Sequence, residues 1–441
     1  MDTIIVGAGL AGLACAGELE RSGKRVVVLE KSDQVGGRVA TDSVRGFKID
    51  RGFQVYLDAY PEGRMQLDLL ALKLNRFEPG ALVAENGKLK GVSDPWKRPS
   101  AAIRSLCNGT ISIPDAIRIA FLRRHVLARY HSANGMRGTK SDLENNFSSR
   151  TTREFLLARG FSDECMRRFF EPFFGGVFLE RKLETSSDIF EFTFAMFSLG
   201  SASLPADGMG AITLQLASRL APGTVQLHQQ VERVEPGRVF FANGETISAK
   251  HVVVATTFSS AAKILPQEVC DHFSTRTWKS TRMVAFAALK SPLQSRTLVV
   301  SADKDGPIDN LCVPSDIAPS YAPSGASLVV ASIRAEWTAS EEATLEAVRL
   351  QLLGWFGQAA RNWEMISFVK IAEALPDESP QARCTRPTET TCVAGISLCG
   401  DYCTSASING ALYSGRRCAE KLLLQTGETK PPRNSWAECS S

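Results

Sequence analysis

The chain has 441 residues, of which 44% are hydrophobic and 22% charged, and its formal net charge is +4. This length exceeds what one hydrophobic core supports, so we expect two or three domains in a globular protein. The small net charge, with no block of Lys and Arg, gives nucleic-acid binding no support. No run of about eighteen apolar residues predicts a membrane-spanning helix, and the histidines are too scattered to predict a metal site.

Eleven cysteines are spread along the chain without the spacing of a metal or disulfide framework. No secretory signal precedes the first predicted strand, so we expect reduced thiols and a cytoplasmic location, or an organelle stroma if a targeting peptide has been removed. The closest pair, Cys399 and Cys403, is either a redox couple or two buried thiols, and we favour buried thiols.

The first thirty residues carry a dinucleotide-binding fingerprint. An apolar strand leads into Gly7, Gly9 and Gly12, a helix follows as far as about Gly23, and a second apolar strand ends at Glu30. The first glycine permits a tight turn, the second lets backbone approach a pyrophosphate, and the third lets the helix lie close to the sheet. The free N–H groups of the helix favour phosphate, and Glu30 is placed to accept hydrogen bonds from ribose hydroxyls.

The next segments predict a mainly helical insertion. Gly36-Gly37-Arg38 forms a second glycine-rich turn, and residues 47–55 predict strand, tight turn, strand. From about residue 61 to 204, helical signals dominate and strand signals are few. The helix expected over 116–131 combines apolar residues with four arginines, which fits either a helix on a membrane surface or, as we favour, a cap helix with a solvated basic face.

Ten phenylalanines cluster between residues 161 and 197. We expect most of them to form helix core and a minority to line an apolar substrate channel. The pattern then returns to strands at 225–228, 231–234, 238–241, 251–256, 283–289 and 327–333, followed by a helix near 340–355.

The end of the chain mirrors its beginning. An apolar strand at 396–399 ends in Gly400-Asp401, and a helix is predicted from Ile408 to about Leu424. Strand and helix units of one nucleotide domain therefore occur at the start, middle and end, which indicates a domain interrupted by insertions. The N-terminus of this late helix favours negative charge on a reduced flavin ring. The polar tail 426–441 is expected to be disordered.

With these motifs in view, the chain resembles the FAD-dependent oxidoreductases of the flavin amine oxidase and phytoene desaturase type over nearly its whole length. The resemblance rests on the opening fingerprint, on Gly36-Gly37-Arg38, on residues 205–211, on Cys399-Gly400-Asp401 and on residues 407–411. It implies FAD rather than NAD as the cofactor.

The resemblance also implies roles for single residues. It places Arg38 at the FAD phosphates, Val231 against the adenine, Asp401 at ribityl or pyrophosphate oxygens and the Ile408 backbone at the flavin pyrimidine. Taken with the motifs, the predicted cofactor residues are Gly7, Gly9, Leu10, Ala11, Gly12, Glu30, Lys31, Gly37, Arg38, Gly52, Phe53, Gln54, Val231, Gly400, Asp401 and Ile408. No catalytic residue is assigned.

The predicted fold is α/β: a discontinuous Rossmann-like FAD-binding domain with an inserted α+β substrate domain and a helical cap. The FAD-binding domain is predicted over 1–75, 205–270 and 385–425, the helical cap over 76–204, and the substrate-domain sheet and helices over 271–384.

Two segments, Gly52-Phe53-Gln54 with Ala59-Tyr60-Pro61 and the stretch 400–415, are closer to the desaturase branch. The strand at Met283 lacks the lysine that amine oxidases usually carry beside flavin N5. We therefore predict a desaturase or dehydrogenase that acts on an apolar, isoprenoid- or carotenoid-like substrate by hydride transfer to flavin N5. The alternatives are an amine or amino-acid oxidase and, more remotely, a non-catalytic binding protein on this scaffold. The electron acceptor is unassigned, and peripheral membrane contact is an open possibility.

Overall fold

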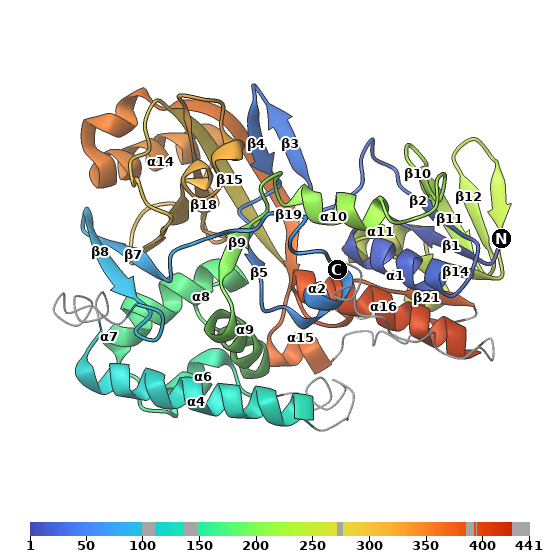
Figure 1. The fold of residues 1–441 in the computed structure, drawn as a ribbon, viewed down its shortest axis with the longest axis horizontal. Helices are drawn as coiled ribbons and strands as arrows, with labels where there is room; N and C mark the ends of the chain where they lie inside the picture. Colours follow the sequence, from blue (N-terminus) through green and yellow to red (C-terminus); the bar gives the residue numbers. More distant parts are fainter. Residues whose placement is uncertain (99–110, 136–147, 271–276, 385–391, 394, 426–441) are drawn as a thin grey trace.

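The computed structural model describes residues 1–98, 111–135, 148–270, 277–384, 392–393 and 395–425. Figure 1 shows a sheet with flanking helices near both termini, a second sheet at the opposite end of the molecule, and a layer of helices beneath that second sheet. The α/β class predicted from the sequence is confirmed. The tail 426–441 lies outside the described residues.

The sheet near the termini has six strands in the order β10-β2-β1-β14-β21-β20. Its strands are β1 (Thr3–Val6), β2 (Val26–Leu29), β10 (Val225–Gln226), β14 (His251–Val254), β20 (Cys392–Val393) and β21 (Ile396–Leu398). All neighbours pair in parallel except β20 and β21. The parallel pairing explains why β1, β2 and β14 are short, nearly all apolar and buried on both faces.

Alternate residues of these strands point into two separate cores. Ile5, Val28 and Val253 pack with α1 (Leu10–Arg21), α10 (Gly210–Ala217) and α16 (Ile408–Gln425). On the opposite face, the strands pack with the small sheet β11 (Val231–Glu235), β12 (Arg238–Phe241) and β13 (Thr246–Ser248), and with α11 (Phe258–Ile264) and α12 (Gln267–Cys270).

The second large sheet has seven strands in the order β19-β15-β18-β17-β16-β7-β8. Its strands are β7 (Gly80–Glu85), β8 (Lys88–Ser93), β15 (Trp278–Ala288), β16 (Leu298–Ser301), β17 (Ile308–Cys312), β18 (Ser327–Ile333) and β19 (Glu364–Pro376). One face packs against α14 (Glu341–Phe356) through Val284 and Phe286. Met283 and Ala285, which alternate with them, belong to the core on the other side.

A helical layer lies under this sheet. It consists of α4 (Ile113–Gly135), α6 (Thr152–Leu157), α7 (Asp163–Cys165), the π-helical turn η1 (Met166–Phe170), α8 (Glu171–Phe178) and α9 (Ser187–Leu199). The remaining elements are β3 (Thr41–Val44), β4 (Phe47–Asp50), β5 (Tyr56–Leu57), α2 (Pro61–Gln66), β6 (Asn75–Arg76), β9 (Ala202–Leu204), α13 (Pro314–Ile317), η2 (Pro319–Tyr321), η3 (Gly357–Asn362), α15 (Pro380–Cys384) and η4 (Asp401–Cys403).

Most predicted elements are confirmed, including the opening strand–helix–strand unit and the late helix from Ile408. The prediction of few strands between 61 and 204 is wrong at β7 and β8, which form a hairpin and join the seven-stranded sheet by pairing of β7 with β16. The strand expected to end at Val55 starts instead at Tyr56, because the turn after Gly52 is longer than predicted. The domain boundaries remain a prediction.

The segment 205–211, one of the motifs in the resemblance, is anchored by a buried carboxylate. Asp50 accepts hydrogen bonds from the Thr41 hydroxyl at 2.5 Å, the Met209 N–H at 2.9 Å and the Tyr321 hydroxyl at 2.9 Å. Burial raises the pKa of the Asp50 carboxyl to about 6, although these three donors favour the ionised form.

The raised pKa of Asp50 predicts a pH-dependent stability. The pKa of Asp50 in the folded protein lies above the unfolded value near 3.8. The stability that the protonated Asp50 carboxyl contributes is therefore fully present below about pH 4 and is lost as the pH rises through 6. Between these limits, the wild type should lose about 3 kcal/mol relative to Asp50→Asn. Urea unfolding of both proteins at several pH values measures this difference, and parallel pH profiles would contradict it.

Candidate cofactor and substrate site

A cavity of about 1160 Å³ lies between the two large sheets and the helical layer. All of the predicted cofactor residues except Gly12 line it, although they come from segments as distant as Gly7 and Ile408. Ligand pockets of about 300–1,000 Å³ hold one drug-sized molecule. This volume therefore suits a dinucleotide together with part of a second molecule.

The N-terminus of α1 offers backbone donors to the cavity. Its N-cap, Gly9, provides no side-chain hydrogen bond, yet Leu10 and Ala11 in the first turn are buried. A Cβ built on Gly9 meets no atom within 4 Å, so any side chain there projects into open cavity. A buried, uncapped helix N-terminus is suited to an anion such as pyrophosphate.

Gly12 serves packing rather than the cavity surface. A Cβ on Gly12 would lie 2.0 Å from the Gly7 carbonyl oxygen, and one on Gly415 of α16 would lie 2.1 Å from the Ala11 carbonyl oxygen. Both glycines let helices approach backbone closely, and α16 is thereby held against the first turn of α1. The packing role predicted for Gly12 agrees with this geometry.

Glu30 stands at the carboxyl end of β2, as predicted. It is 7% exposed, and its two carboxylate oxygens accept the Ala8 N–H at 2.8 Å and the Ser32 N–H at 2.9 Å. Lys31 beside it is exposed, and Val231, the first residue of β11, is buried at the same end of the cavity. The fixed carboxylate retains acceptor capacity for ribose hydroxyls.

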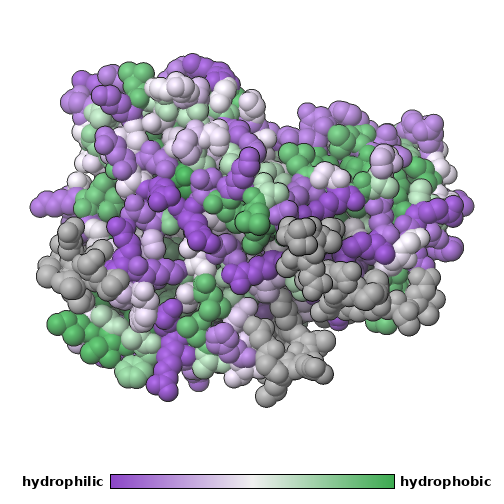
Figure 2. Space-filling view, in the orientation of Figure 1, coloured by the Kyte–Doolittle hydropathy of each residue, from purple (hydrophilic) through white to green (hydrophobic). Residues whose placement is uncertain are grey.

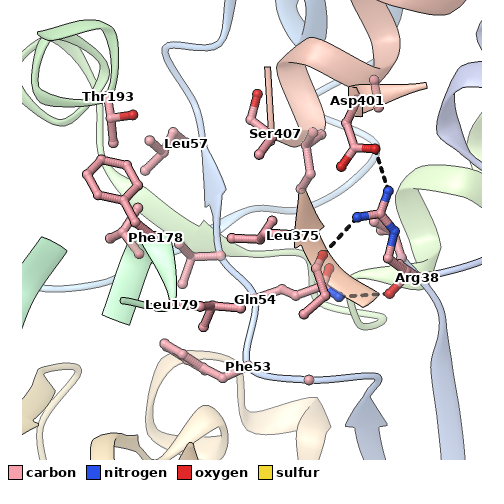
Figure 3. A pocket seen from close by; sticks show the side chains of 18 of the residues that line it. Arg38, Phe53, Gln54, Leu57, Phe178, Leu179, Thr193, Leu375, Asp401 and Ser407 are labelled. Carbon is pink, nitrogen blue, oxygen red and sulfur yellow. Dashed lines mark hydrogen bonds and ion pairs between the residues drawn. The ribbon is translucent and has the colours of Figure 1, made fainter. Parts of the chain in front are cut away.

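Arg38 and Asp401 meet across the cavity wall. Their side chains pair at 2.5 Å, and Arg38 also donates to the Ala374 carbonyl oxygen at 2.8 Å (Figure 3). The negative charge of Asp401 raises the pKa of the Arg38 guanidinium. The sequence placed both residues at the cofactor but not in contact with each other. Their predicted contacts with FAD oxygens remain a prediction.

The N-terminus of α16 closes the same region. The Ser407 hydroxyl accepts the Gly410 N–H at 2.9 Å and caps the helix, which leaves Ile408 on the cavity wall. Cys399, just before Gly400, is fully buried among the residues of α1 and α16, whereas Cys403 packs in the core on the other face of the sheet. This separation favours two buried thiols over a redox couple.

The cavity wall between the cofactor end and the other end of the cavity includes Gly52, Phe53 and Gln54. Gln54 donates from Nε2 to the backbone oxygens of Arg38 at 2.8 Å and Arg51 at 3.0 Å. Figure 3 shows Phe53, Leu57 and Phe178 around the space beyond it. The glutamine is thus held by the glycine-rich turn, and the surface past it becomes apolar.

The opposite end of the cavity, which we call the aromatic lobe, is lined mainly by rings and aliphatic side chains. Its residues are Phe53, Leu57, Phe169, Phe173, Phe174, Val177, Phe178, Leu179, Phe192, Phe194, Phe197, Leu298 and Val300. Seven of the ten clustered phenylalanines therefore line the cavity, and the expectation that only a minority would do so is wrong. Rings pack both on each other and along the lobe, as Phe173 and Phe197 do at 5.2 Å.

Several lining residues were not predicted from the sequence. Thr281 lies on β15 and Leu375 on β19, and Trp96 and Lys97 follow the β7–β8 hairpin. These segments carry no cofactor motif, and β19 and the hairpin were not predicted as strands. The signal that could have identified the hairpin is the apolar run at the start of β7 followed by Asn86-Gly87, a typical two-residue hairpin turn.

Comparison with known proteins identifies the family. The family model for flavin-containing amine oxidoreductases matches residues 10–423. The chain belongs to the flavin-containing amine oxidoreductase family. It is therefore an FAD-dependent oxidoreductase, and the resemblance stated from its motifs is confirmed.

Single relatives of this amine oxidoreductase match shorter segments. An L-amino-acid oxidase of Bungarus fasciatus is 41% identical over 76 residues, which cover 17% of this chain and 15% of the relative. A phytoene dehydrogenase of Streptomyces griseus is 51% identical over 49 residues, which cover 11% and 10%. The chain thus spans only 10–15% of the length of these two curated relatives.

The fold as a whole is shared with solved structures. A putrescine oxidase variant superposes with a TM-score of 0.70 at 16% identity, over 96% of this chain and 99% of that one. At this identity the similarity establishes the fold of the amine oxidoreductase and nothing about its substrate.

The residues present fit FAD. The uncapped N-terminus of α1, the open space beside Gly9 and the fixed Glu30 carboxylate suit a pyrophosphate with an attached ribose. The cavity then continues into the aromatic lobe, where the second molecule would lie. Binding by the individual cofactor residues stays a prediction.

Proposed function

We propose that this amine oxidoreductase is a desaturase or dehydrogenase that removes hydride from an apolar, isoprenoid- or carotenoid-like substrate. The aromatic lobe carries this proposal, because a long apolar chain buries favourably against phenylalanine and leucine side chains. The segment shared with a phytoene dehydrogenase is consistent with it. Bound FAD would supply the hydride acceptor.

The chain's own residues position the reactants and exclude water. The rings of the aromatic lobe hold the substrate, and Gln54, fixed by two backbone oxygens, sets the boundary between this lobe and the cofactor end. The side chains that define the aromatic lobe carry no ionisable group, and at the cofactor end Arg38 and Asp401 neutralise each other. Hydride transfer needs a close, water-poor approach rather than an acid or base, and the apolar side chains of the aromatic lobe favour such an approach.

Amine or amino-acid oxidation is the second candidate. The L-amino-acid oxidase segment and the putrescine oxidase fold support it at the level of the family. Against it, β15 carries Met283, Val284 and Ala285 where a lysine was sought. None of the side chains that define the aromatic lobe is a carboxylate, although Glu78 and Asp94 line the cavity outside it.

Anaerobic reduction of the FAD-loaded protein separates these functions. Acyclic isoprenoids or carotenes should bleach the flavin absorbance, whereas primary amines, polyamines and amino acids should not. Bleaching by amines alone would overturn the proposal.

The variant Val177→Asp sharpens this experiment, because Val177 is half-buried on the lobe surface. It should slow bleaching by an apolar substrate at least about 10-fold, since an unpaired charge disfavours the apolar ligand. The flavin content should be unchanged. If the protein is instead an amine oxidase, the added carboxylate should preserve or improve bleaching by a cationic amine. Such a response in Val177→Asp would favour the second candidate.

We further propose that the enzyme works in a reducing cytoplasm or organelle stroma, in contact with a lipid surface. The described cysteines whose state is defined are free thiols, which supports the first part. Within the described ranges, no helix has the length and apolar character needed to cross a bilayer.

A further inference from the structure

One face of α4 presents large apolar side chains to solvent. Ile113, Ile117 and Phe121 follow each other at intervals of four residues and are 67%, 53% and 66% exposed. Residues at this spacing share one side of a helix. Figure 2 shows hydrophobic surface at the lower left, where Figure 1 places the first turns of α4. We call these three residues the α4 stripe.

The charges of α4 are almost all positive. The helix contains Arg118, Arg123, Arg124 and Arg129, and its single acid, Asp115, is 1% exposed. Arg118 pairs with Asp115 and Arg129 pairs with Glu191 of α9, so the remaining positive charge comes from Arg123 and Arg124. Arg124 is exposed one helical turn beyond the α4 stripe. An apolar stripe within a basic helix complements an anionic bilayer, in which side chains enter the acyl boundary and arginines meet headgroups.

The same helix forms part of the cavity wall. Ile119 and Arg123 line the cavity, and the Arg123 guanidinium lies 4.7 Å from the ring centroid of Trp96, another lining residue. Trp96 itself is 43% exposed. Tryptophan with one buried and one exposed side is typical of a membrane interface. A molecule held at this surface is therefore close to the aromatic lobe.

We propose that the α4 stripe, with Arg124 and Trp96, docks the protein on an anionic lipid bilayer, from which the apolar substrate passes beside α4 into the aromatic lobe. This rests on the proposed function for the identity of the passing molecule. The docking itself does not, because it depends only on exposed side chains and charge. A bilayer is favoured over a protein partner because Arg124, the exposed cation one turn beyond the stripe, is not matched by an exposed acid on α4.

Co-sedimentation of the FAD-loaded full chain with sucrose-loaded vesicles tests the docking without any substrate. We expect binding to vesicles of phosphatidylcholine with 30% phosphatidylglycerol (about one lipid in three, chosen to supply surface charge), and weaker binding to phosphatidylcholine alone. The double variant Ile117→Asp/Phe121→Asp should lose on the order of 100-fold in partitioning, because both apolar contacts are removed. Arg124→Gln should weaken binding to the anionic vesicles only.

Leu350→Asp is the matched control, because Leu350 is 64% exposed on α14, away from this surface. It should bind vesicles as the wild type does, and flavin content and unfolding temperature verify that each variant is folded. Wild-type protein that fails to bind, or a double variant that binds equally well, overturns the docking proposal and leaves the proposed oxidation untouched. A wild-type dimer that the double variant converts to monomer would identify the stripe as a subunit interface instead. A wild-type protein that binds vesicles but whose flavin no isoprenoid or carotene reduces would refute the proposed function and leave the docking proposal standing.

Discussion

Replacement of Gly9 by leucine is expected to abolish FAD binding and leave a folded protein. The Gly9 backbone has φ −79° and ψ −178°, which a leucine adopts without strain, and its Cβ would meet no protein atom within 4 Å. The side chain would instead fill the space before the N-terminus of α1, where the pyrophosphate is expected. We expect at least a 100-fold loss of FAD affinity, roughly the loss of about 3 kcal/mol of binding, measured by flavin titration of apoprotein.

Gly17→Leu is the control for this experiment. Gly17 lies on the same helix, a Cβ on it also meets nothing within 4 Å, and it does not line the cavity. As apoproteins both variants should unfold near the same temperature, whereas after addition of FAD only Gly9→Leu should stay colourless and gain no stability. Full flavin content in Gly9→Leu would show that the cofactor lies elsewhere and would remove the basis of the site assignment.

The cofactor end was predictable from the sequence because its chemistry constrains single positions. A strand turning directly into an uncapped helix needs glycine where backbone meets backbone, as Gly12 does against Gly7. An acid at the end of the next strand follows from ribose recognition, and Glu30 is held there by two N–H groups. These requirements are local, so a short stretch of residues expresses them.

The aromatic lobe was less predictable because packing of apolar groups is tolerant of residue type. A phenylalanine in α8 has the same sequence signature whether it faces core or cavity, and the π-helical turn before α8 shifts the register on which a helical pattern depends. The β7–β8 hairpin joins its sheet by pairing with β16, about two hundred residues later, and no local pattern encodes that partner. The Arg38–Asp401 pair was missed for the same reason, since the two residues come from opposite ends of the chain.

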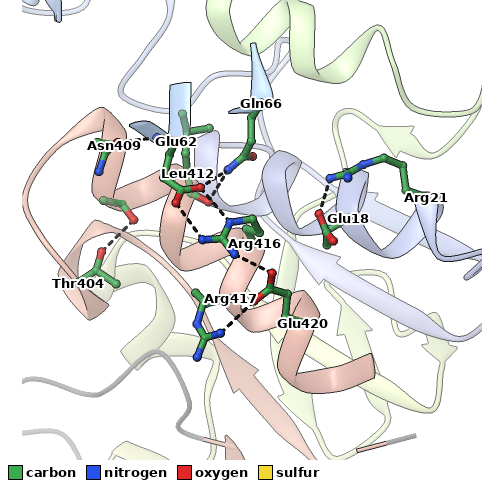
Figure 4. Close-up of polar contacts among 11 residues, drawn as sticks. Glu18, Arg21, Glu62, Gln66, Thr404, Asn409, Leu412, Arg416, Arg417 and Glu420 are labelled. Atoms are coloured by element: carbon green, nitrogen blue, oxygen red, sulfur yellow. Dashed lines mark hydrogen bonds and ion pairs between the residues drawn. The ribbon is translucent and has the colours of Figure 1, made fainter. Parts of the chain in front are cut away.

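Arg416→Met is expected to lower the free energy of unfolding by about 3–5 kcal/mol, because it leaves the buried Glu62 carboxylate without its cation, whereas Glu420 keeps its pair with Arg417. Arg416 binds both oxygens of Glu62 at 2.9 Å and one oxygen of Glu420 at 2.7 Å, and Glu62 is fully buried (Figure 4). These carboxylates raise the pKa of the Arg416 guanidinium. Urea unfolding followed by flavin and tryptophan fluorescence gives the difference.

The effect should extend to the cofactor, because the ion pairs fix α2 against α16. Glu62 also donates its N–H to the Asn409 side chain at 3.0 Å, next to Ile408 on the cavity wall. A loosened α16 N-terminus should therefore weaken FAD binding about 10-fold, worth about 1.4 kcal/mol. Arg417→Met is the matched control, since Arg417 is more exposed and its pair with Glu420 at 3.0 Å is worth about 1 kcal/mol or less. Equal losses of unfolding free energy in the two variants would mean that the burial of Glu62 does not decide the energy of these ion pairs. Unchanged FAD affinity in Arg416→Met would show that the ion pairs do not support the cofactor end.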